Sequence, residues 1–204
     1  MGKRLFDLMA SLLGLLLLGL PMLLLALAIR LDSPGPALFR QERVGRHGRV
    51  FRMHKFRTMR QATAPEGRAE DLLLTPAGDD RITRVGRWLR DRRLDEMPQL
   101  LDVLRGEMSL VGPRPEVPRY VEHYPEALRR QVLSVRPGLT DPAALAHRRE
   151  GEWLAQADDP ERFYVEQVLP NKLRMQAEYA AHASFTSDLA VLARTVGVLV
   201  GSRS

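Results

Sequence analysis

Asp95 and Glu96 are adjacent carboxylates, here termed the dyad, whose residue types and neighbours suit a catalytic or ligand-binding site. Arginines precede the dyad, and a rigid Gly-Pro-Arg-Pro turn that contains Arg114 follows it. Arginine matches the geometry and the charge of phosphate oxygens. Carboxylates held between arginines are therefore typical of a site for a phosphorylated substrate.

The local pattern around the dyad predicts a helix. Apolar residues recur at helical spacing from Met97 to Leu104, and Pro98 is tolerated only in the first turn of a helix, so the helix should begin close to the dyad. A helix N-terminus keeps a carboxylate ionised and also favours phosphate. The alternative is a plain N-terminal cap with an acidic first turn, which is the commoner use of such a pair.

Composition limits the classes of function. The 204 residues support one domain with an appendage at most, and the net charge of +6 suits anionic lipid headgroups, nucleotide phosphates or nucleic acid. The chain has no cysteine, which excludes disulfides and thiolate metal sites. Its five histidines are scattered without metal-ligand spacing, so a zinc enzyme is not expected.

The N-terminal segment is uncharged from Leu8 to Ile29, and as a helix it would be long enough to span a bilayer. A cleaved signal peptide is disfavoured because the apolar run is too long and Asp7 interrupts the charged region. A spanning helix and a re-entrant helix-break-helix hinged at Pro21 both stay open, because prolines also occur in spanning helices.

The rest of the chain reads as mainly α with a small β-hairpin, an α+β class. Residues 37–44 and 49–59 flank a glycine-rich turn and predict the hairpin, with Lys55 and Arg57 on one face of the second strand or, alternatively, on a merely solvated basic face. We expect domains at 1–32 and 33–204, and a mobile loop at 61–80. Helices are expected over much of 82–104, 117–135, 163–169, 171–182 and 184–200, the last one amphipathic, packing on the core with partial membrane contact.

Four motifs follow the apolar segment in order. They are Arg43-x-Gly45-x-x-Gly48-x-x-Phe51-x-x-x-Lys55-Phe56-Arg57-Thr58-Met59, Leu94-Asp95-Glu96-x-Pro98-Gln99-Leu100, Ser109-Leu110-Val111-Gly112-Pro113-Arg114-Pro115 and Arg136-Pro137-Gly138-Leu139-Thr140. Each is modest alone, but the ordered set is specific. Together they resemble the bacterial sugar transferase family, the monotopic polyprenyl-phosphate phosphoglycosyl transferases, in the minimal form without extra transmembrane helices.

The resemblance implies an activity. The family transfers a sugar phosphate from a nucleotide sugar, usually uridine-linked, to polyprenyl phosphate and releases the nucleoside monophosphate. Asp95 matches the nucleophile that forms an aspartyl phosphosugar intermediate. Mg²⁺ is expected as cofactor, with Asp95 and Glu96 as its candidate ligands, and Glu96 is expected to position the metal or the Asp95 carboxylate.

The resemblance also assigns supporting residues and a location. The expected phosphate-binding residues are Arg114, Arg90, Lys55 and Arg57, and the turn residues at the site are Pro113, Pro115, Pro137 and Gly138. A re-entrant helix broken at Pro21 would place both chain ends and the site on the cytosolic face of the bacterial inner membrane, where nucleotide sugars occur. The expected partners are the nucleotide sugar, polyprenyl phosphate and membrane lipids but no nucleic acid, and the sequence is compatible with a homo-oligomer.

Three departures from the family pattern limit what carries over. Leu20-Pro21 replaces the common Ser-Pro pair, Asp141-Pro142-Ala143-Ala144 replaces Gly-Trp-Ala-Gln, and Gln176 stands where many members have an aspartate. The family contacts to nucleotide and sugar from the C-terminal third are therefore not carried over.

Other functions predict different behaviour. A basic, membrane-anchored scaffold would use the dyad only as a helix cap. A nucleic-acid-binding protein is disfavoured, because acids interrupt the arginines and no aromatic-rich basic strand is present. A phosphohydrolase would use water in place of polyprenyl phosphate to release the sugar phosphate.

Overall fold

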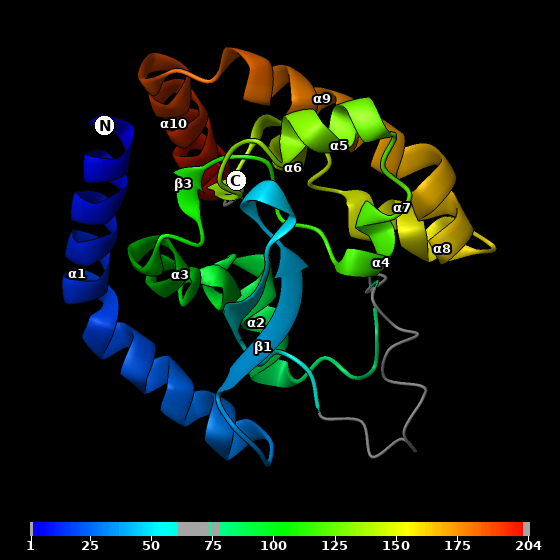
Figure 1. Ribbon diagram of the computed structural model, residues 1–204. Helices are drawn as coiled ribbons and strands as arrows, with labels where there is room; N and C mark the ends of the chain where they lie inside the picture. Colours follow the sequence, from blue (N-terminus) through cyan, green and yellow to red (C-terminus); the bar gives the residue numbers. More distant parts are fainter. Residues whose placement is uncertain (1, 61–73, 75–77, 202–204) are drawn as a thin grey trace.

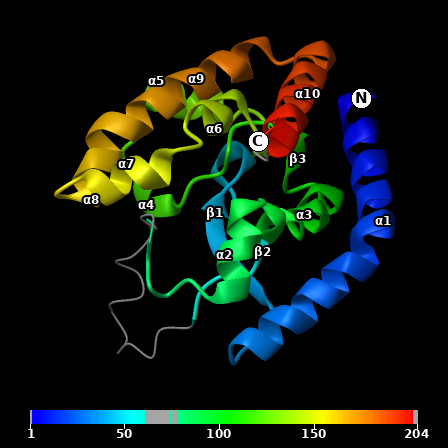
Figure 2. The ribbon, with the colours of Figure 1, turned by 180° about the vertical axis from the view of Figure 1, so that it is seen from behind.

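The computed structural model describes residues 2–60, 74 and 78–201, with the side chains of 199 and 200 left aside. A long N-terminal helix, α1 (Gly2–Asp32), lies along one side of a mainly helical body (Figures 1 and 2). Within the described residues, the body holds two small sheets of two strands each. The predicted class, mainly α with a small β-hairpin, is therefore confirmed. The expected mobile loop at 61–80 falls mostly outside the described residues.

The remaining elements follow in chain order. They are β1 (Leu38–Val44), the 3₁₀ turn η1 (Arg46–Gly48), β2 (Val50–Phe56), α2 (Arg84–Asp91), the 3₁₀ turn η2 (Leu94–Glu96), α3 (Gln99–Arg105), β3 (Ser109–Val111), α4 (Pro118–Val121), α5 (Glu126–Val132), β4 (Gly138–Thr140), α6 (Pro142–Ala146), α7 (Glu150–Gln156), α8 (Pro160–Phe163), the π-helical turn η3 (Tyr164–Val168), α9 (Leu169–His182) and α10 (Phe185–Gly201).

The predicted hairpin is confirmed. Strands β1 and β2 pair antiparallel, with Leu38 opposite Phe56 and Val44 opposite Val50. The strand β2 ends at Phe56, and the two cations expected on one face have different surroundings. Lys55 faces the charges of the dyad, whereas the guanidinium of Arg57 lies against the end of α1.

The second sheet was not predicted. Strands β3 and β4 are parallel and only three residues long, with Ser109 opposite Gly138 and Val111 opposite Thr140. Strands this short carry no alternating pattern that a sequence reading could detect. Directly after β3, Gly112 lies so close to Gly138 that a Cβ on Gly138 would come within 2.0 Å of the Gly112 nitrogen. The sheet therefore brings together the two proline-containing turns, at residues 112–115 and 136–138.

Three apolar clusters hold the body. The first joins the end of β1 to α4, α5, α7, η3 and α9, and the second joins β2, α3 and β3 to α9 and α10. The third joins the C-terminal part of α1 to β2 and α2. Helix α10 buries Val191 in the second cluster and leaves Phe185 and Val196 exposed, in line with an amphipathic helix that packs on the core.

Helix α1 is one continuous, bent helix of 31 residues that contains Pro21, so the structure shows a bend in place of the expected break, and the re-entrant course of the helix stays a prediction (Figure 1). Proline removes one hydrogen bond and crowds the preceding turn, which bends a helix while the rest of its ladder persists. The helix is long and apolar enough to cross a membrane, and only 6% of its most apolar window is buried in the protein. This composition indicates membrane association.

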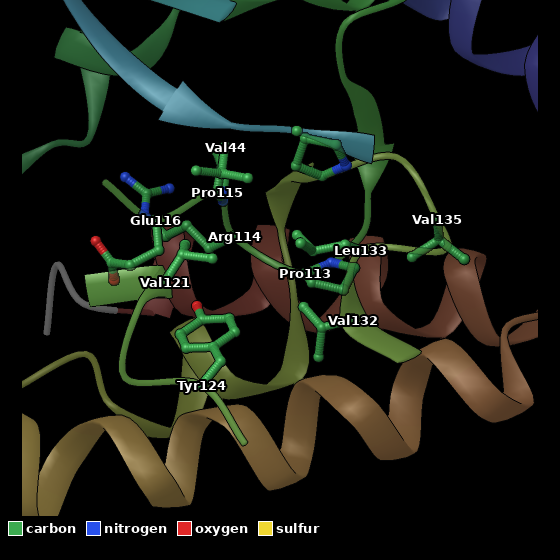
Figure 3. Close-up of a pocket in the computed structure, with 12 residues that line it drawn as sticks. Val44, Pro113, Arg114, Pro115, Glu116, Val121, Tyr124, Val132, Leu133 and Val135 are labelled. Carbon is green, nitrogen blue, oxygen red and sulfur yellow. The ribbon is translucent and has the colours of Figure 1, made fainter. Parts of the chain in front are cut away.

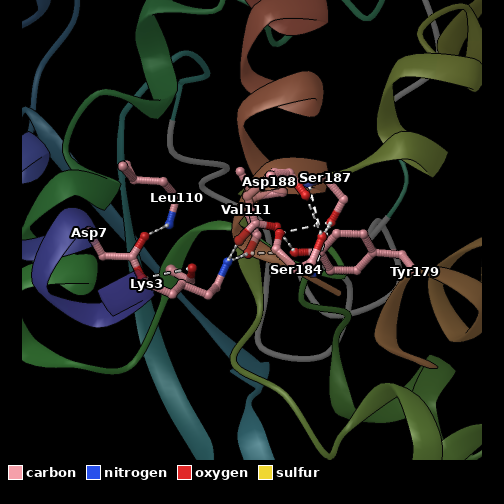
Figure 4. Close-up of polar contacts among 10 residues, drawn as sticks. Lys3, Asp7, Leu110, Val111, Tyr179, Ser184, Ser187 and Asp188 are labelled. Atoms are coloured by element: carbon pink, nitrogen blue, oxygen red, sulfur yellow. Dashed lines mark hydrogen bonds and ion pairs between the residues drawn. The ribbon is translucent and has the colours of Figure 1, made fainter. Parts of the chain in front are cut away.

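The N-terminal end of α1 is hydrogen-bonded to β3 (Figure 4). The buried Asp7 carboxylate accepts hydrogen bonds from the Ser109 hydroxyl at 2.9 Å and from the Leu110 amide at 3.1 Å. Lys3 donates to the Val111 carbonyl at 3.0 Å and pairs with Asp188 at the start of α10. A buried carboxylate is stable only with such partners, so this end of α1 is fixed to the body.

The C-terminal end of α1 is fixed to the same body. The Arg57 guanidinium donates to the Ile29 carbonyl at 3.3 Å, to the Ser33 carbonyl at 2.6 Å and to the Pro34 carbonyl. The Asp32 carboxylate accepts a hydrogen bond at 3.1 Å from the amide of Val85, near the start of α2. Both ends of the apolar helix are thus bound to one globular body, while leucines along its middle are exposed.

Replacing Arg57 by methionine (Arg57→Met) should lower the free energy of unfolding by about 2–3 kcal/mol, because several charge-assisted bonds to the end of α1 are lost. Urea unfolding in detergent, followed by tryptophan fluorescence, measures this change. The control is Arg52→Met, since Arg52 is 71% exposed in an ion pair with Glu42 and should contribute less than about 0.5 kcal/mol. Equal effects of the two substitutions would contradict the anchoring role of Arg57.

A Gly138→Ala variant should lose about 3 kcal/mol or more, because the new Cβ would meet main-chain atoms that cannot move aside. The matched control is Gly197→Ala in α10, where a Cβ meets nothing within 4 Å and alanine favours the helix by about 1 kcal/mol. Thermal unfolding of both variants tests the contrast. A Gly138→Ala protein as stable as the wild type would refute the close approach of the two turns.

Candidate active site

The dyad lies in η2, a single 3₁₀ turn between α2 and α3. Helix α3 begins at Gln99, so the predicted helix does begin close to the dyad, but the two carboxylates precede it. Arg93, just before η2, has a φ of 56°, a left-handed conformation that non-glycine residues rarely adopt. Backbone strain of this kind is common where a chain must present functional groups at a sharp change of direction.

Glu96 and Arg114 form a two-pronged ion pair between η2 and the Gly-Pro-Arg-Pro turn. One prong joins Arg114 Nη1 to Glu96 Oε2 at 3.0 Å, and the other joins Arg114 Nη2 to Glu96 Oε1. Burial alone would raise the pKa of Glu96, but the charges of Arg114 and Lys55 outweigh it and lower that pKa to about 2. Glu96 is therefore ionised, and both of its oxygens are engaged by Arg114.

Asp95 differs from its neighbour in having no hydrogen-bond or ion-pair partner for its carboxylate in the described part of the chain. Its side chain is buried, with 8% of the residue exposed, and among the described residues no hydrogen bond or ion pair reaches its carboxylate. Burial, and then the negative charge of Glu96, raise the pKa of Asp95 above its ordinary value. A carboxylate with little solvation and no hydrogen-bond donor keeps its lone pairs available for attack on an electrophile.

Two cations beside the dyad have no anionic partner in the described part of the chain. They are Lys55 on β2 and Arg90 on α2, and both exert an attractive charge on Asp95 from beyond ion-pair distance. Burial lowers the pKa of Lys55 to about 8 and also lowers the pKa of Arg90. Cations that are costly to bury and are left unpaired attract an anionic ligand.

The Gly-Pro-Arg-Pro turn is held by main-chain hydrogen bonds to β4. Gly112 donates to the Thr140 carbonyl at 3.1 Å, and Gly138 donates to the Pro113 carbonyl at 3.0 Å. Pro113 and other residues of the turn, with apolar residues around α5, line a cavity of about 10 Å³ (Figure 3). That volume holds about one water molecule, so this side of the turn is packing and cannot receive a nucleotide.

The structure thus brings together most of the sequence-predicted site. The electrostatic interactions join five of the predicted residues in one place, namely Asp95, Glu96, Arg114, Lys55 and Arg90. Three turn residues, Pro113, Pro115 and Pro137, line the same small cavity as Arg114, and Gly138 donates to the Pro113 carbonyl. Arg57 and Pro21 do not join this cluster. Arg57 holds the end of α1, and Pro21 lies within that helix.

Two further residues, Asp141 and Arg43, contact the turn and were not predicted as site residues. The buried carboxylate of Asp141 accepts a hydrogen bond from the Arg114 amide, and Arg43 donates to the Pro115 carbonyl at 3.1 Å while pairing with Glu116. An Asp-Pro pair such as Asp141-Pro142 is a recognisable helix start. That signal predicts the cap of α6, but it does not reveal the bond to Arg114.

The chain is similar to several proteins named as undecaprenyl-phosphate sugar transferases. The chain is 40% identical to the UDP-glucose:undecaprenyl-phosphate glucose-1-phosphate transferase of Caulobacter vibrioides over 97% of this chain and 69% of that protein. It is 39% identical to the undecaprenyl-phosphate glucose phosphotransferase of Komagataeibacter xylinus over 99% of this chain and 36% of that protein. It is 34% identical to the Escherichia coli protein with the same name as the Caulobacter one, over 95% of this chain and 39% of that protein.

The chain thus spans about two thirds of the first relative and well under half of the other two. The family model described as bacterial sugar transferase matches residues 1–202, which is nearly the whole chain. The ordered motifs, the clustered dyad and cations, and this match lead to one conclusion: the chain belongs to the bacterial sugar transferase family.

Proposed function

We propose that this protein transfers a sugar 1-phosphate from a uridine diphosphate sugar to polyprenyl phosphate, with undecaprenyl phosphate as the natural acceptor. The observation that carries the proposal is the unpaired, buried Asp95 carboxylate beside two unpaired cations, Lys55 and Arg90. A donor pyrophosphate would supply the missing negative charge, and Asp95 would supply the nucleophile. The names of the relatives support this donor and this acceptor.

The reaction proceeds in two displacements at one phosphorus atom. A carboxylate oxygen of Asp95 bonds to the β-phosphorus of the donor, while the bond from that phosphorus to the bridging oxygen breaks. Uridine monophosphate leaves with the bridging oxygen and its electron pair. An oxygen of polyprenyl phosphate then bonds to the same phosphorus, and the Asp95 oxygen leaves. Neither displacement requires a proton transfer when Asp95 and polyprenyl phosphate react in their ionised forms.

The three cations of the site, Lys55, Arg90 and Arg114, contribute to phosphate binding in different ways. Lys55 and Arg90 are free to neutralise the pyrophosphate as Asp95 approaches it. Arg114 keeps its guanidinium on Glu96 and presents its remaining N–H groups. Glu96 therefore orients Arg114 in this proposal, and we replace its expected role as a metal ligand with this one.

Mg²⁺ fits the site only together with the substrate. The described residues contain no group of three acidic or histidine side chains that could hold a metal, and Arg114 occupies both oxygens of Glu96. Mg²⁺ is commonly held by one or two carboxylates together with phosphate oxygens and water. Asp95, with its free carboxylate, is the residue that would hold the ion, which when bound would neutralise pyrophosphate charge.

The membrane arrangement follows from the two anchors of α1. Asp7 and Arg57 fix opposite ends of the helix to one globular body, so we propose that α1 enters and leaves the bilayer through the same face. The apolar middle of the helix is then the inserted part. Because uridine diphosphate sugars are cytosolic, that face is assigned to the cytosolic side of the bacterial inner membrane.

The defining experiment measures uridine monophosphate release by detergent-solubilised protein, across a panel of uridine diphosphate sugars, with Mg²⁺ and undecaprenyl phosphate. Asp95→Asn should reduce release by at least about 10³-fold, since the nucleophile is lost, while folding is preserved because no partner of Asp95 is orphaned. The exposed Asp91→Asn on α2 is the matched control. Equal rates for Asp95→Asn and the control, or no release by folded wild type, would favour the scaffold.

The lowered pKa of Lys55 predicts that the donor binds more weakly at alkaline pH. Its pKa of about 8 means that the ammonium, which binds phosphate, is lost as pH rises through about 8. The KM for the donor should therefore increase above about pH 8 with little change in kcat. In Lys55→Arg the side chain stays charged, and the increase should disappear up to about pH 10. A pH profile of KM that is the same in both proteins would contradict this role.

A further inference from the structure

Asp141 is buried more completely than a helix cap requires. The residue has 0% exposure, and its carboxylate accepts hydrogen bonds from three separate segments. The donors are the amide of Ala144 in α6, the amide of Arg114 in the turn, and the Nε2 group of Gln176 in α9 at 3.0 Å. A buried carboxylate with three donors is a stable junction, because each donor offsets part of its desolvation.

The two oxygens of Asp141 have different tasks. Oδ1 receives the Ala144 amide, which is the ordinary N-cap bond of α6. Oδ2 receives both the Arg114 amide and Gln176. The chain contains a natural control in Asp159-Pro160, where Asp159 caps α8 through the Arg162 amide, is exposed, and reaches no part of the turn. The bonds made by Oδ2 are thus additional to capping.

The bond to the Arg114 amide fixes the main chain that carries the guanidinium. Pro113 and Pro115 restrict the backbone on both sides of Arg114, and Asp141 Oδ2 secures the one N–H group between them. The negative charge of Asp141 also acts on the guanidinium, after the larger effect of Glu96. Asp141 therefore fixes the main chain of Arg114, while Glu96 fixes its guanidinium.

We propose that Asp141 is a positioning residue for the phosphates of the donor, acting through Arg114, and that Gln176 orients the Asp141 carboxylate for this task. The inference rests on the proposed function, since it takes Arg114 to bind the pyrophosphate. Gln176 is itself buried, with 3% exposure, and its amide donates to the oxygen that also receives Arg114. Both positions are departures from the family pattern, and the structure joins them in a single hydrogen-bonded unit.

The test uses the isosteric variant Asp141→Asn. Its remaining oxygen can still cap α6, but the new NH₂ group would face the Arg114 amide and Gln176 as a third donor. The KM for the donor should rise about tenfold or more, the equivalent of one charge-assisted hydrogen bond, with a smaller change in kcat. Binding of inorganic pyrophosphate with Mg²⁺, measured by calorimetry, should weaken by a similar factor. Asp159→Asn, the matched Asp-Pro cap, should leave both quantities unchanged.

Folded Asp141→Asn with the KM and pyrophosphate affinity of Asp159→Asn would overturn the inference. If Asp141→Asn does not fold, Gln176→Leu decides: a several-fold rise in KM supports the inference, and an unchanged KM overturns it. Failure of the proposed function gives a different result, namely no uridine monophosphate release by wild type. In that case the inference is tested by pyrophosphate binding alone. Weaker binding by the Asp141 or Gln176 variant than by wild type supports it, whereas equal binding, or no binding by wild type, overturns it.

Discussion

The ion pair between Glu96 and Arg114 determines how the rest of the site is arranged. It joins the 3₁₀ turn of the dyad to the proline turn, two segments that share no strand or helix. A partly buried ion pair is most favourable when both charges are well matched, and here both carboxylate oxygens are engaged. Because Glu96 takes the guanidinium, Asp95 has no cation at ion-pair distance among the described residues, and two chemically similar acids have different surroundings.

Local signals in the sequence predicted the parts of the site but not its supports. The dyad, the Gly-Pro-Arg-Pro turn and the hairpin each depend on a few neighbouring residues, so a sequence reading could identify them. The β3–β4 pair and the contacts of Asp7 were not predicted, because they join positions about thirty to a hundred residues apart. Arg57 shows the same limit: the resemblance to the family suggested phosphate binding, and only the position of the end of α1 showed the contacts that its guanidinium makes.

Positions 141 and 176 carry a related lesson about family motifs. Taken separately, an aspartate after Thr140 and a glutamine in α9 look like losses of expected contacts. In the structure the two side chains are hydrogen-bonded to each other and, through Asp141, to Arg114. A motif reading compares positions one at a time, whereas the cost of burying a carboxylate is decided by all its donors together.

The shape of α1 has a consequence for the lipid around it. In the re-entrant arrangement proposed above, a helix fixed at both ends to one side of the bilayer would displace lipid from that leaflet only, and its exposed leucines would occupy area that acyl chains otherwise fill. Under this proposal, the energy of insertion would depend on how tightly the lipids of one leaflet are packed. Loosely packed or outwardly curved membrane would then accept the protein more easily than flat, dense membrane.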